Sequence, residues 1–282
     1  MAGAIRYGLV AGNGSLPVAV AERLAEQGQS PFVARIAGEA DPSLARFDGG
    51  EFTLERIASV VPAMSGAGVT HAIMAGGVRR RPRIADLRVP RALWLDLVQV
   101  VPGLRSGDNA LLSVLVRVFE RHGMSVVGAH TVLPDHVAPA GQIGACAPRT
   151  PDNAAADAAI AAARAIGTLD IGQAVVAVGT RIVAVEGVEG TDAMLARVRQ
   201  LRDDGRVDAA RPAVLAKMLK PNQDARADMP TIGPHTIANA AAAGVRRICV
   251  SANGTLIMNV AETIRLADDA GIALVGVGEA VS

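Results

Sequence analysis

The chain has 282 residues, enough for two domains of ordinary size, and half of its residues are hydrophobic whereas 20% are charged. This balance excludes an intrinsically disordered chain, and 28 basic against 27 acidic residues leave no overall electrostatic case for binding nucleic acid. Aromatic residues make up only 2% of the chain, so aliphatic side chains must build its cores, and stacking surfaces for single-stranded nucleic acid are mostly lacking.

In the first half of the chain, short β-branched runs alternate with segments of helix length. This rhythm is typical of βαβ units and predicts a Rossmann-like parallel sheet in a domain covering residues 1–133. The stretch 134–152 holds four prolines and two glycines and is predicted to be a linker. The predicted strands are 7–10, 32–36, 71–74 and 125–127, and the predicted helices are 16–27, 54–64, 85–100 and 109–122.

Residues 153–282 are predicted to form a second α/β domain. Two strands, 174–178 and 182–185, are separated by Gly179-Thr180-Arg181, which indicates a hairpin and therefore a mixed sheet. The fold class is thus α/β, with a Rossmann-like N-terminal domain followed by an α/β domain with a mixed sheet. The other predicted elements are helices at 153–166, 191–201, 236–243 and 257–270, and strands at 213–218, 247–250 and 272–275.

Cys146 and Cys249 show no CxxC or Cys/His spacing, which argues against a disulfide scaffold and a structural zinc site. The first strand begins almost at once, without the pattern of a secretion signal, and no run reaches about 18 predominantly apolar residues. We therefore expect a cytoplasmic protein without a transmembrane segment. Such a protein can still act on a lipid at a membrane surface as a peripheral contact.

A glycine-rich segment, Ala11–Pro17, follows the first predicted strand and opens a helix. Backbone N–H groups and the helix dipole at such a point can hold an anionic group, and glycines let the backbone approach it closely. The spacing is GxGxxP, however, with proline in place of the third glycine of the dinucleotide fingerprint, and Arg35 ends the second strand instead of an acid. A plain tight turn is the alternative. The candidate ligand-binding residues here are Gly12, Asn13, Gly14 and Leu16.

A second such segment, Ala75–Arg83, follows the third predicted strand. Because ligands collect beyond the carboxyl ends of parallel strands, we expect it to lie beside the first segment. Four of its residues are arginines, which can bind phosphate through two hydrogen bonds, although a short basic run is more often a solvated surface. The candidate ligand-binding residues here are Gly76, Gly77, Val78 and Arg79.

The densest chemistry lies between residues 217 and 234, KMLKPNQDARADMPTIGP. Asp224 and Asp228 offer hard oxygen ligands for Mg²⁺, and Lys217, Lys220 and Arg226 offer cations that can offset the charge on phosphate oxygens. Phosphoryl transfer needs both kinds of group. The alternative is a structural loop held by salt bridges.

Three further segments are candidate supporting parts, each with an ordinary structural alternative. Asp108, with Asn109, precedes an apolar helix and is read as an N-cap or a substrate contact. Thr191 and Asp192 either cap a helix or belong to a loop, Glu186–Asp192, whose acids reach a metal. The segment Ser251–Thr255, with Asn253 and Thr255, is either an anion-binding turn or a plain one.

The five histidines lack i,i+4 pairing and no nucleophile elbow is present, so neither an HExxH metal site nor a serine-hydrolase triad is predicted. We interpret these histidines as structural. Phosphoryl transfer to water, the chemistry that residues 217–234 suggest, needs charge neutralisation and in-line positioning more than a protein nucleophile. The histidine pattern is compatible with that chemistry.

Taken together, the segments AGNGSLP, AGGVRRRP, SGDNALL, EGVEGTD, KPNQDARADMPTIGP and ANGTL make the chain resemble the LpxI family of UDP-2,3-diacylglucosamine pyrophosphatases. The segment KPxQDxRxDxPTIGP is the most specific part. The resemblance implies hydrolysis of the pyrophosphate of UDP-2,3-diacylglucosamine to UMP and 2,3-diacylglucosamine 1-phosphate (lipid X). This is a Mg²⁺-dependent step of lipid A synthesis in Gram-negative bacteria. It also implies a Rossmann-like N-terminal domain, a C-terminal α/β domain and substrate held between them.

The same resemblance implies roles for individual residues. Asp224 and Asp228 would bind Mg²⁺ (or Mn²⁺) and activate water, while Lys217, Lys220 and Arg226 would lie near the phosphates. The implied partner is a lipid-linked UDP-sugar met at the inner membrane; a homodimer is expected only from the general frequency of dimers. An NADP-dependent oxidoreductase and a non-catalytic nucleotide-sugar binder remain the alternatives. The further candidate substrate-binding residues are Asp108, Asn109, Thr191, Asp192, Gln223, Ala225, Asn253 and Thr255.

Overall fold

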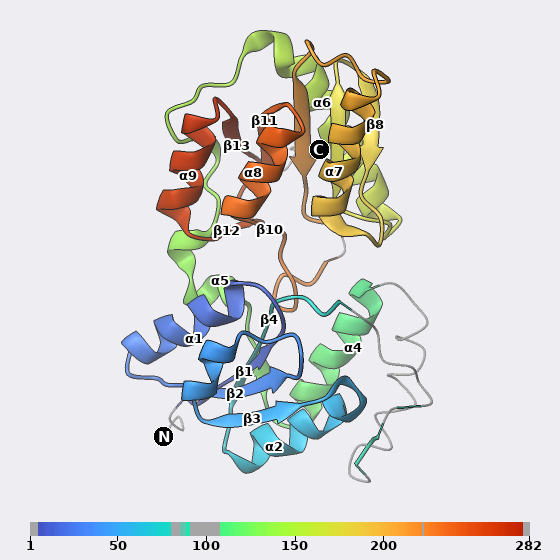
Figure 1. Ribbon diagram of the computed structural model, residues 1–282. Helices are drawn as coiled ribbons and strands as arrows, with labels where there is room; N and C mark the ends of the chain where they lie inside the picture. The colour runs from blue at the N-terminus through green and yellow to red at the C-terminus, as the bar shows by residue number, and fades with distance from the viewer. Residues whose placement is uncertain (1–4, 80–85, 87, 91–107, 222, 279–282) are drawn as a thin grey trace. The chain divides into compact units, whose positions relative to one another are not determined.

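The computed structural model describes residues 5–79, 86, 88–90, 108–221 and 223–278 (Figure 1). The predicted helix at 85–100 and the arginines at 80, 81 and 83 therefore lie outside the described residues, apart from isolated positions. The chain divides into two compact units. Unit 1 comprises Met1–Pro134 together with Asp224–Asp228, and unit 2 comprises Asp135–Gln223 and Met229–Ser282.

The sheet of unit 1 has five parallel strands in the order β3-β2-β1-β4-β5. Strands β3, β2 and β1 have the order of one Rossmann half-sheet, and β4 and β5 continue the sheet on the other side of β1. The predicted Rossmann-like fold is therefore confirmed. The central strands β1 and β4 are largely buried, which explains why most of their residues are aliphatic. The strands are β1 (Tyr7–Ala11), β2 (Phe32–Ile36), β3 (Gly49–Phe52), β4 (His71–Ala75) and β5 (Ser125–Val126).

Helices cover this sheet. One aliphatic core joins it to α2 and α4 through side chains such as Met64 and Val118, while α1 and α5 pack against each other and against β4. The predicted helix at 54–64 divides into a 3₁₀ helix, Leu54–Ser59, and α2. The α-helices of unit 1 are α1 (Leu16–Glu26), α2 (Val60–Gly66), α4 (Asp108–Arg121) and α5 (Ala129–Val132), and a further 3₁₀ helix spans Pro42–Arg46.

The main sheet of unit 2 has six strands in the order β6-β13-β11-β9-β7-β8. Strand β11 is parallel to β9 and β13, whereas β6, β7 and β8 pair antiparallel, so the predicted mixed sheet and its hairpin are confirmed. The strands are β6 (Gly141–Ile143), β7 (Ala174–Val178), β8 (Arg181–Val185), β9 (Ala213–Lys217), β11 (Val245–Ser251) and β13 (Ala273–Val277). A separate pair is formed by β10 (Thr231–Ile232) and β12 (Leu256–Ile257).

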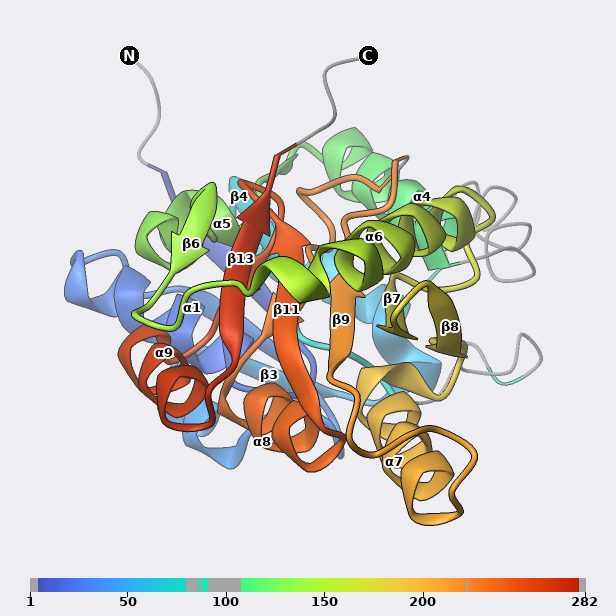
Figure 2. The same cartoon turned by 90° about the horizontal axis from the view of Figure 1, so that it is seen from above.

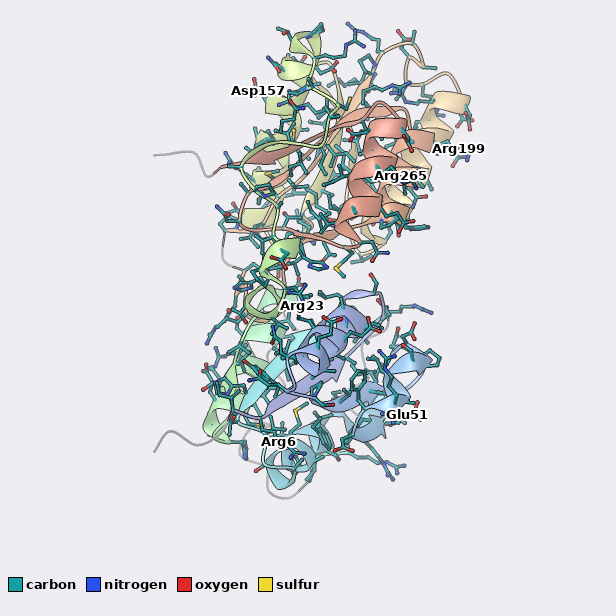
Figure 3. The ribbon with its side chains drawn as sticks, turned by 90° about the vertical axis from the view of Figure 1, so that its left-hand side faces the viewer. Arg6, Arg23, Glu51, Asp157, Arg199 and Arg265 are labelled. Carbon is teal, nitrogen blue, oxygen red and sulfur yellow. The ribbon has the colours of Figure 1, made fainter. Side chains whose placement is uncertain are left out.

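Unit 2 has three layers, as Figure 2 shows, with α6 on one face of the sheet and α7, α8 and α9 on the other. The α6 face is packed with alanine, which lets this helix lie close to β7 and β9. Arg199 on α7 and Arg265 on α9, both labelled in Figure 3, each form an exposed ion pair one turn along their own helix. The helices are α6 (Asn153–Thr168), α7 (Gly190–Asp203), α8 (Pro234–Ala242) and α9 (Val260–Asp269).

The stretch 134–152, for which a linker is predicted, contains regular structure. It carries β6, which extends the sheet of unit 2 beside β13, and two 3₁₀ helices, Pro134–His136 and Thr150–Asp152. Among the residues that the structure describes, no helix combines the length and apolarity that crossing a membrane requires.

Candidate active site

The candidate residues of unit 1 gather at one edge of its sheet. In a parallel sheet the carboxyl ends of all strands meet at the same edge, which is where ligands of such folds bind. Gly12 follows β1, Gly76 follows β4 and Glu39 lies just beyond β2. Gly128, which the segment Asp224–Asp228 approaches, follows β5. Four neighbouring strands thus deliver one continuous row of loops.

The two glycine-rich loops are hydrogen-bonded to each other. Gly12 N–H donates to the Ala75 carbonyl at 2.9 Å, and Asn13 N–H donates to the Gly77 carbonyl at 2.8 Å, with Gly77 N–H returning a bond to Asn13 at 3.3 Å. A Cβ on Gly12 would lie 2.3 Å from the Gly77 carbonyl oxygen. These glycines therefore let the two loops meet, and their N–H groups are used inside the protein.

An anion at this edge has its remaining backbone donors at the start of α1. The helix begins at Leu16, and Ser15 in the cap position makes no side-chain capping bond. The N–H groups of a first helical turn have no partner within the helix and lie at the positive end of its dipole. The anion contact stays a prediction, and the position that the helix start favours for it is Gly14–Leu16, one step further along than Gly12 and Asn13.

Glu39 joins the same two loops, and the sequence analysis missed it. Its side chain is only 8% exposed, accepts a hydrogen bond from the Asn13 side-chain amide at 3.1 Å and accepts another from Arg79 N–H at 3.0 Å. The Arg79 guanidinium, 75% exposed, lies 3.6 Å from the same carboxylate. The sequence signal for Glu39 is an acid shortly after the second strand, whereas the dinucleotide pattern expects an acid at the end of that strand, where Arg35 stands.

The segment Asp224–Asp228 is anchored within unit 1. Ala227 is 7% exposed and belongs to the core that α2 and α4 share. Arg226 donates to Glu120 on α4 at 2.8 Å and to both oxygens of Asp224, at 3.0 and 2.8 Å. A Cβ on Gly128 would lie 2.9 Å from the Ala225 carbonyl oxygen, so this glycine permits a close approach. Salt bridges thus hold this segment, as the structural alternative expects, and the predicted catalytic role of its acids stays a prediction.

Arg226 sets the electrostatics of Asp224. Hydrogen bonds from the Arg226 side chain hold the pKa of the Asp224 carboxyl below its ordinary value, against a smaller opposing effect of burial. The paired acids in turn raise the pKa of Arg226. Asp224 is therefore an ionised carboxylate at neutral pH, suited to accepting hydrogen bonds or a cation and unsuited to donating a proton.

The acidic side chains of the described residues determine which kind of divalent-cation site is possible. Among the described residues, no three His, Cys, Asp or Glu side chains gather as metal ligands. Mg²⁺ usually takes only one or two carboxylates and completes its coordination with phosphates and water. Asp224 Oδ1 accepts two hydrogen bonds from Arg226, whereas Oδ2 accepts one and has a further lone pair, and Asp228 is exposed. The residues thus fit a cation held mainly by a phosphate ligand, not a closed protein cage.

In unit 2, a second group of candidates lies where β9 ends. Lys217 is only 8% exposed, and its ammonium donates to the Thr191 hydroxyl at 3.0 Å. That hydroxyl donates to Glu186 at 2.5 Å, and the other Glu186 oxygen accepts from Gln173 N–H at 2.9 Å. We call Glu186, Thr191 and Lys217 the relay. Thr191 is not a helix cap, because α7 begins at Gly190 and its polar group is turned toward Lys217.

Other candidates lie at the same end of the unit 2 sheet. Lys220 forms an ion pair with Asp170 at 2.7 Å, and Ser251 accepts a hydrogen bond from Leu219 N–H at 2.8 Å. Asn253 has a left-handed backbone with φ of 57°, as its tight turn requires. The Thr255 hydroxyl is fully buried and has no hydrogen-bond partner among the described residues.

The remaining candidates are placed apart from the relay or are described only in part. Asp192 pairs with His235 and accepts from Asn239, which ties α7 to α8. The Gln223 side chain accepts from Lys220 N–H at 3.3 Å. Asp108 and Asn109 are the first two residues of α4, and Val78 is 42% exposed.

Comparison with known proteins agrees with this division of the chain. Residues 6–136 match the family model described as the LpxI N-terminal domain, and residues 139–275 match the LpxI C-terminal domain. The chain is also 38% identical over 273 residues to the UDP-2,3-diacylglucosamine pyrophosphatase LpxI of Caulobacter vibrioides, covering 96% of this chain and 97% of that protein. These matches give no support to the oxidoreductase alternative. The chain belongs to the LpxI family.

Proposed function

We propose that this protein hydrolyses the pyrophosphate bond of UDP-2,3-diacylglucosamine to UMP and 2,3-diacylglucosamine 1-phosphate. The observation that carries the proposal is the match of both halves of the chain to LpxI, together with a relative of that named activity aligned over 96% of the chain. The lipid product is the precursor that the sequence resemblance implies for lipid A synthesis.

The chemistry requires a water oxygen to bond one phosphorus while the bridging P–O bond breaks. One proton leaves the water, and the bridging oxygen departs on the other phosphate. Anion-binding groups must offset the charge on the phosphate oxygens. The start of α1, Arg79 and the buried Lys217 are the groups that we assign to this task, and the ionised Asp224 is the one that we assign to orienting the water.

We further propose that the reaction is assisted by Mg²⁺ (or Mn²⁺), with Asp224 and Asp228 as its protein donors. When bound, such an ion draws charge from phosphate oxygens and increases the acidity of a bound water. The fit rests on the exposed Asp228 and on Asp224 Oδ2, which accepts one hydrogen bond from Arg226 and has a second lone pair. Chelation by EDTA is expected to lower turnover, and restored turnover on adding Mg²⁺ tests this part alone.

The substrate is amphiphilic, so we also propose a cytoplasmic protein that meets it at the surface of the inner membrane. Exposed Leu169, Ile171 and Val188 occupy loops at the relay end of the unit 2 sheet, where they could meet acyl chains. Co-sedimentation with vesicles that contain or lack the substrate tests the membrane contact.

The deciding experiment incubates the full chain with UDP-2,3-diacylglucosamine and Mg²⁺ in ¹⁸O water. We expect UMP and the diacylglucosamine 1-phosphate in equal amounts, with one ¹⁸O atom in one of the two; the labelled product identifies the attacked phosphorus. Absence of UMP release with Mg²⁺ and with Mn²⁺ would refute the proposed hydrolysis. Tight binding of NADPH by such an inactive protein would revive the oxidoreductase alternative.

A further inference from the structure

The relay holds two charged side chains that are almost completely withdrawn from water. Glu186 is 6% exposed and Lys217 is 8% exposed, and they are linked through the hydroxyl of Thr191. Burial of a charged group is unfavourable unless hydrogen bonds compensate for the lost water. Such an arrangement therefore has either a structural purpose or a chemical one, and the direction of its hydrogen bonds distinguishes the two.

The hydroxyl of Thr191 has one proton, and the structure fixes where that proton lies. An ionised carboxylate only accepts hydrogen bonds, so Thr191 donates to Glu186 and presents its oxygen lone pairs to Lys217. The second Glu186 oxygen accepts from Gln173 N–H, which fixes the carboxylate itself. The chain of bonds runs in one direction, from the Lys217 ammonium to Thr191 to Glu186.

This direction leaves the ammonium with donors to spare. An ammonium has three N–H groups, and Thr191 is the hydrogen-bond partner that the structure gives to Lys217. A structural ion pair would bring the carboxylate directly to the ammonium. Here the Thr191 hydroxyl lies between them, so the carboxylate orients the ammonium through that hydroxyl, and within the described part of the chain two N–H groups remain for a ligand oxygen.

The surroundings of Lys217 suit a phosphate ligand. Lys217 is the last residue of β9. Strand β7 pairs antiparallel with both β9 and β8, so the start of β7 lies beside the end of β9 and the end of β8. Gln173 and Glu186 flank these strand ends and are hydrogen-bonded to each other. The segment that follows β9 carries Lys220. A second ammonium therefore lies three residues beyond the first, itself held by Asp170.

We propose that Glu186 is a positioning residue for pyrophosphate hydrolysis: acting through the Thr191 hydroxyl, it aims the Lys217 ammonium at a phosphate oxygen of the substrate. The inference rests on the proposed function for the identity of the substrate. It assigns to Glu186 a role different from the metal contact that an acid in this loop first suggests, because Glu186 is buried and its carboxylate is held by the Thr191 hydroxyl and Gln173 N–H.

The test compares two substitutions of Thr191 that differ in one group. Thr191→Val removes the hydroxyl at nearly constant shape, and Thr191→Ser keeps it. We expect Thr191→Val to lower kcat about 10- to 100-fold, on the scale of a misplaced transition-state contact, with a smaller change in KM. Thr191→Ser should keep kcat within about threefold, because the relay remains intact.

Glu186→Gln extends the test to the residue at the far end of the relay. It should lower kcat by a similar factor, and combining it with Thr191→Val should add little, because both changes break one chain of bonds. Thr263→Val is the matched control. Thr263 is fully buried, whereas Thr191 is half-buried; the Thr263 hydroxyl donates to the Met258 carbonyl at 2.6 Å, but Thr263 lies in α9. Its loss should lower the melting temperature and leave kcat unchanged.

The outcomes separate this inference from the proposed function. If the wild type hydrolyses the substrate and Thr191→Val behaves like Thr263→Val, the relay is structural and the inference is wrong while the function stands. If the wild type is inactive, the function fails, and titration with inorganic pyrophosphate decides the relay. Binding weakened at least fivefold by Thr191→Val but not by Thr191→Ser would then support the relay, and equal binding by all three proteins would overturn it.

Discussion

Adding a single methyl group at Gly12 should separate the two glycine loops of unit 1. In Gly12→Ala the new Cβ would lie 2.3 Å from the Gly77 carbonyl oxygen and 3.0 Å from the Gly76 carbonyl carbon. Both atoms belong to backbone, so no side-chain rotation relieves the contact. Since favourable contacts between heavy atoms lie near 3.5 Å, the loops must part by about 1 Å.

That separation determines the size of the expected effect. It weakens the hydrogen bonds between Asn13 and Gly77, each worth about 1 kcal/mol, and adds the strain of overpacking. We expect the free energy of unfolding to fall by about 1 to 3 kcal/mol. Because the loops also place the start of α1, kcat/KM for UDP-2,3-diacylglucosamine should fall roughly 10- to 100-fold, mainly through KM.

Urea unfolding followed by circular dichroism measures the first quantity, and steady-state kinetics measures the second. Two glycine substitutions in unit 1 serve as controls. Gly66→Ala, at the end of α2 with no atom within 4 Å of the new Cβ, should be neutral or stabilising by up to about 1 kcal/mol. Gly14→Ala has equal space but a φ of 91°, so it tests backbone strain without a clash. If Gly12→Ala matches Gly66→Ala in both measurements, the close loop contact does not exist in solution.

Three further results follow from the charged groups. Asp224→Asn should lower kcat at least ~100-fold but change the free energy of unfolding by under ~1 kcal/mol, as for an exposed ion pair. The control Asp203→Asn on α7 should change neither quantity. Equal turnover of the wild type and both variants would remove Asp224 from the reaction. Because the pKa of Asp224 is lowered in the folded state, its ion pair stabilises the fold fully above the ordinary pKa of 3.8. This stabilisation is lost as the pH falls through the lower pKa of the folded state. In urea unfolding measured from pH 7 to pH 2, the free energies of unfolding of wild type and Asp224→Asn should therefore converge only at the acid end. Glu39→Gln keeps the size of the side chain but replaces one acceptor oxygen by a donor, so KM measured by steady-state kinetics should rise several-fold with kcat nearly constant; an unchanged KM would show that Glu39 does not shape the loops in solution.

The parts of the fold that were predictable are those whose pattern is local. Strands such as β1, β4, β7 and β9 are mainly aliphatic runs between turn residues, and their positions were predicted to within one residue. Strands β3 and β6 were not predicted. Strand β3 begins with two glycines, and a Cβ on Gly49 would lie 2.0 Å from the Val33 carbonyl oxygen, so its pairing with β2 excludes the β-branched residues that mark a strand. Strand β6 has three residues, of which two are exposed.

The membership of residues 224–228 in unit 1 also has no local signal. The segment lies inside the sequence of unit 2, and what assigns it to unit 1 is the burial of Ala227 and the pairing of Arg226 with Glu120, 106 residues earlier. A division of the chain into contiguous domains has no place for such a segment. The motif identified the chemistry of Asp224, but only tertiary structure shows that an arginine beside it holds it ionised.

In the candidate site, too, sequence spacing predicts the residue types but not their hydrogen-bond partners. Sequence spacing selected the glycine loops, Thr191 and Lys217, because these residue types occur where anions are bound. It missed Glu39 because the bonds that define its role reach 26 and 40 residues away. Sequence spacing left open whether the acids of the 186–192 loop bind a metal or have only a structural role. The local pattern does not show that Glu186 accepts a hydrogen bond from Thr191.

Hydrogen bonds within the protein restrict which of its polar groups can bind a ligand. Backbone N–H groups of Gly12, Asn13 and Gly77 are used between loops, and the Glu186 oxygens are used within the relay. Counting only the residues that the structure describes, these bonds hold in place two groups with further N–H donors: the first turn of α1 in unit 1 and the Lys217 ammonium in unit 2. Donors without acceptors, held rigidly at the ends of strands, suit a ligand made of acceptor oxygens. A diphosphate is such a ligand, and this is the physical reason why a motif rich in glycines and acids serves a substrate that is itself an anion.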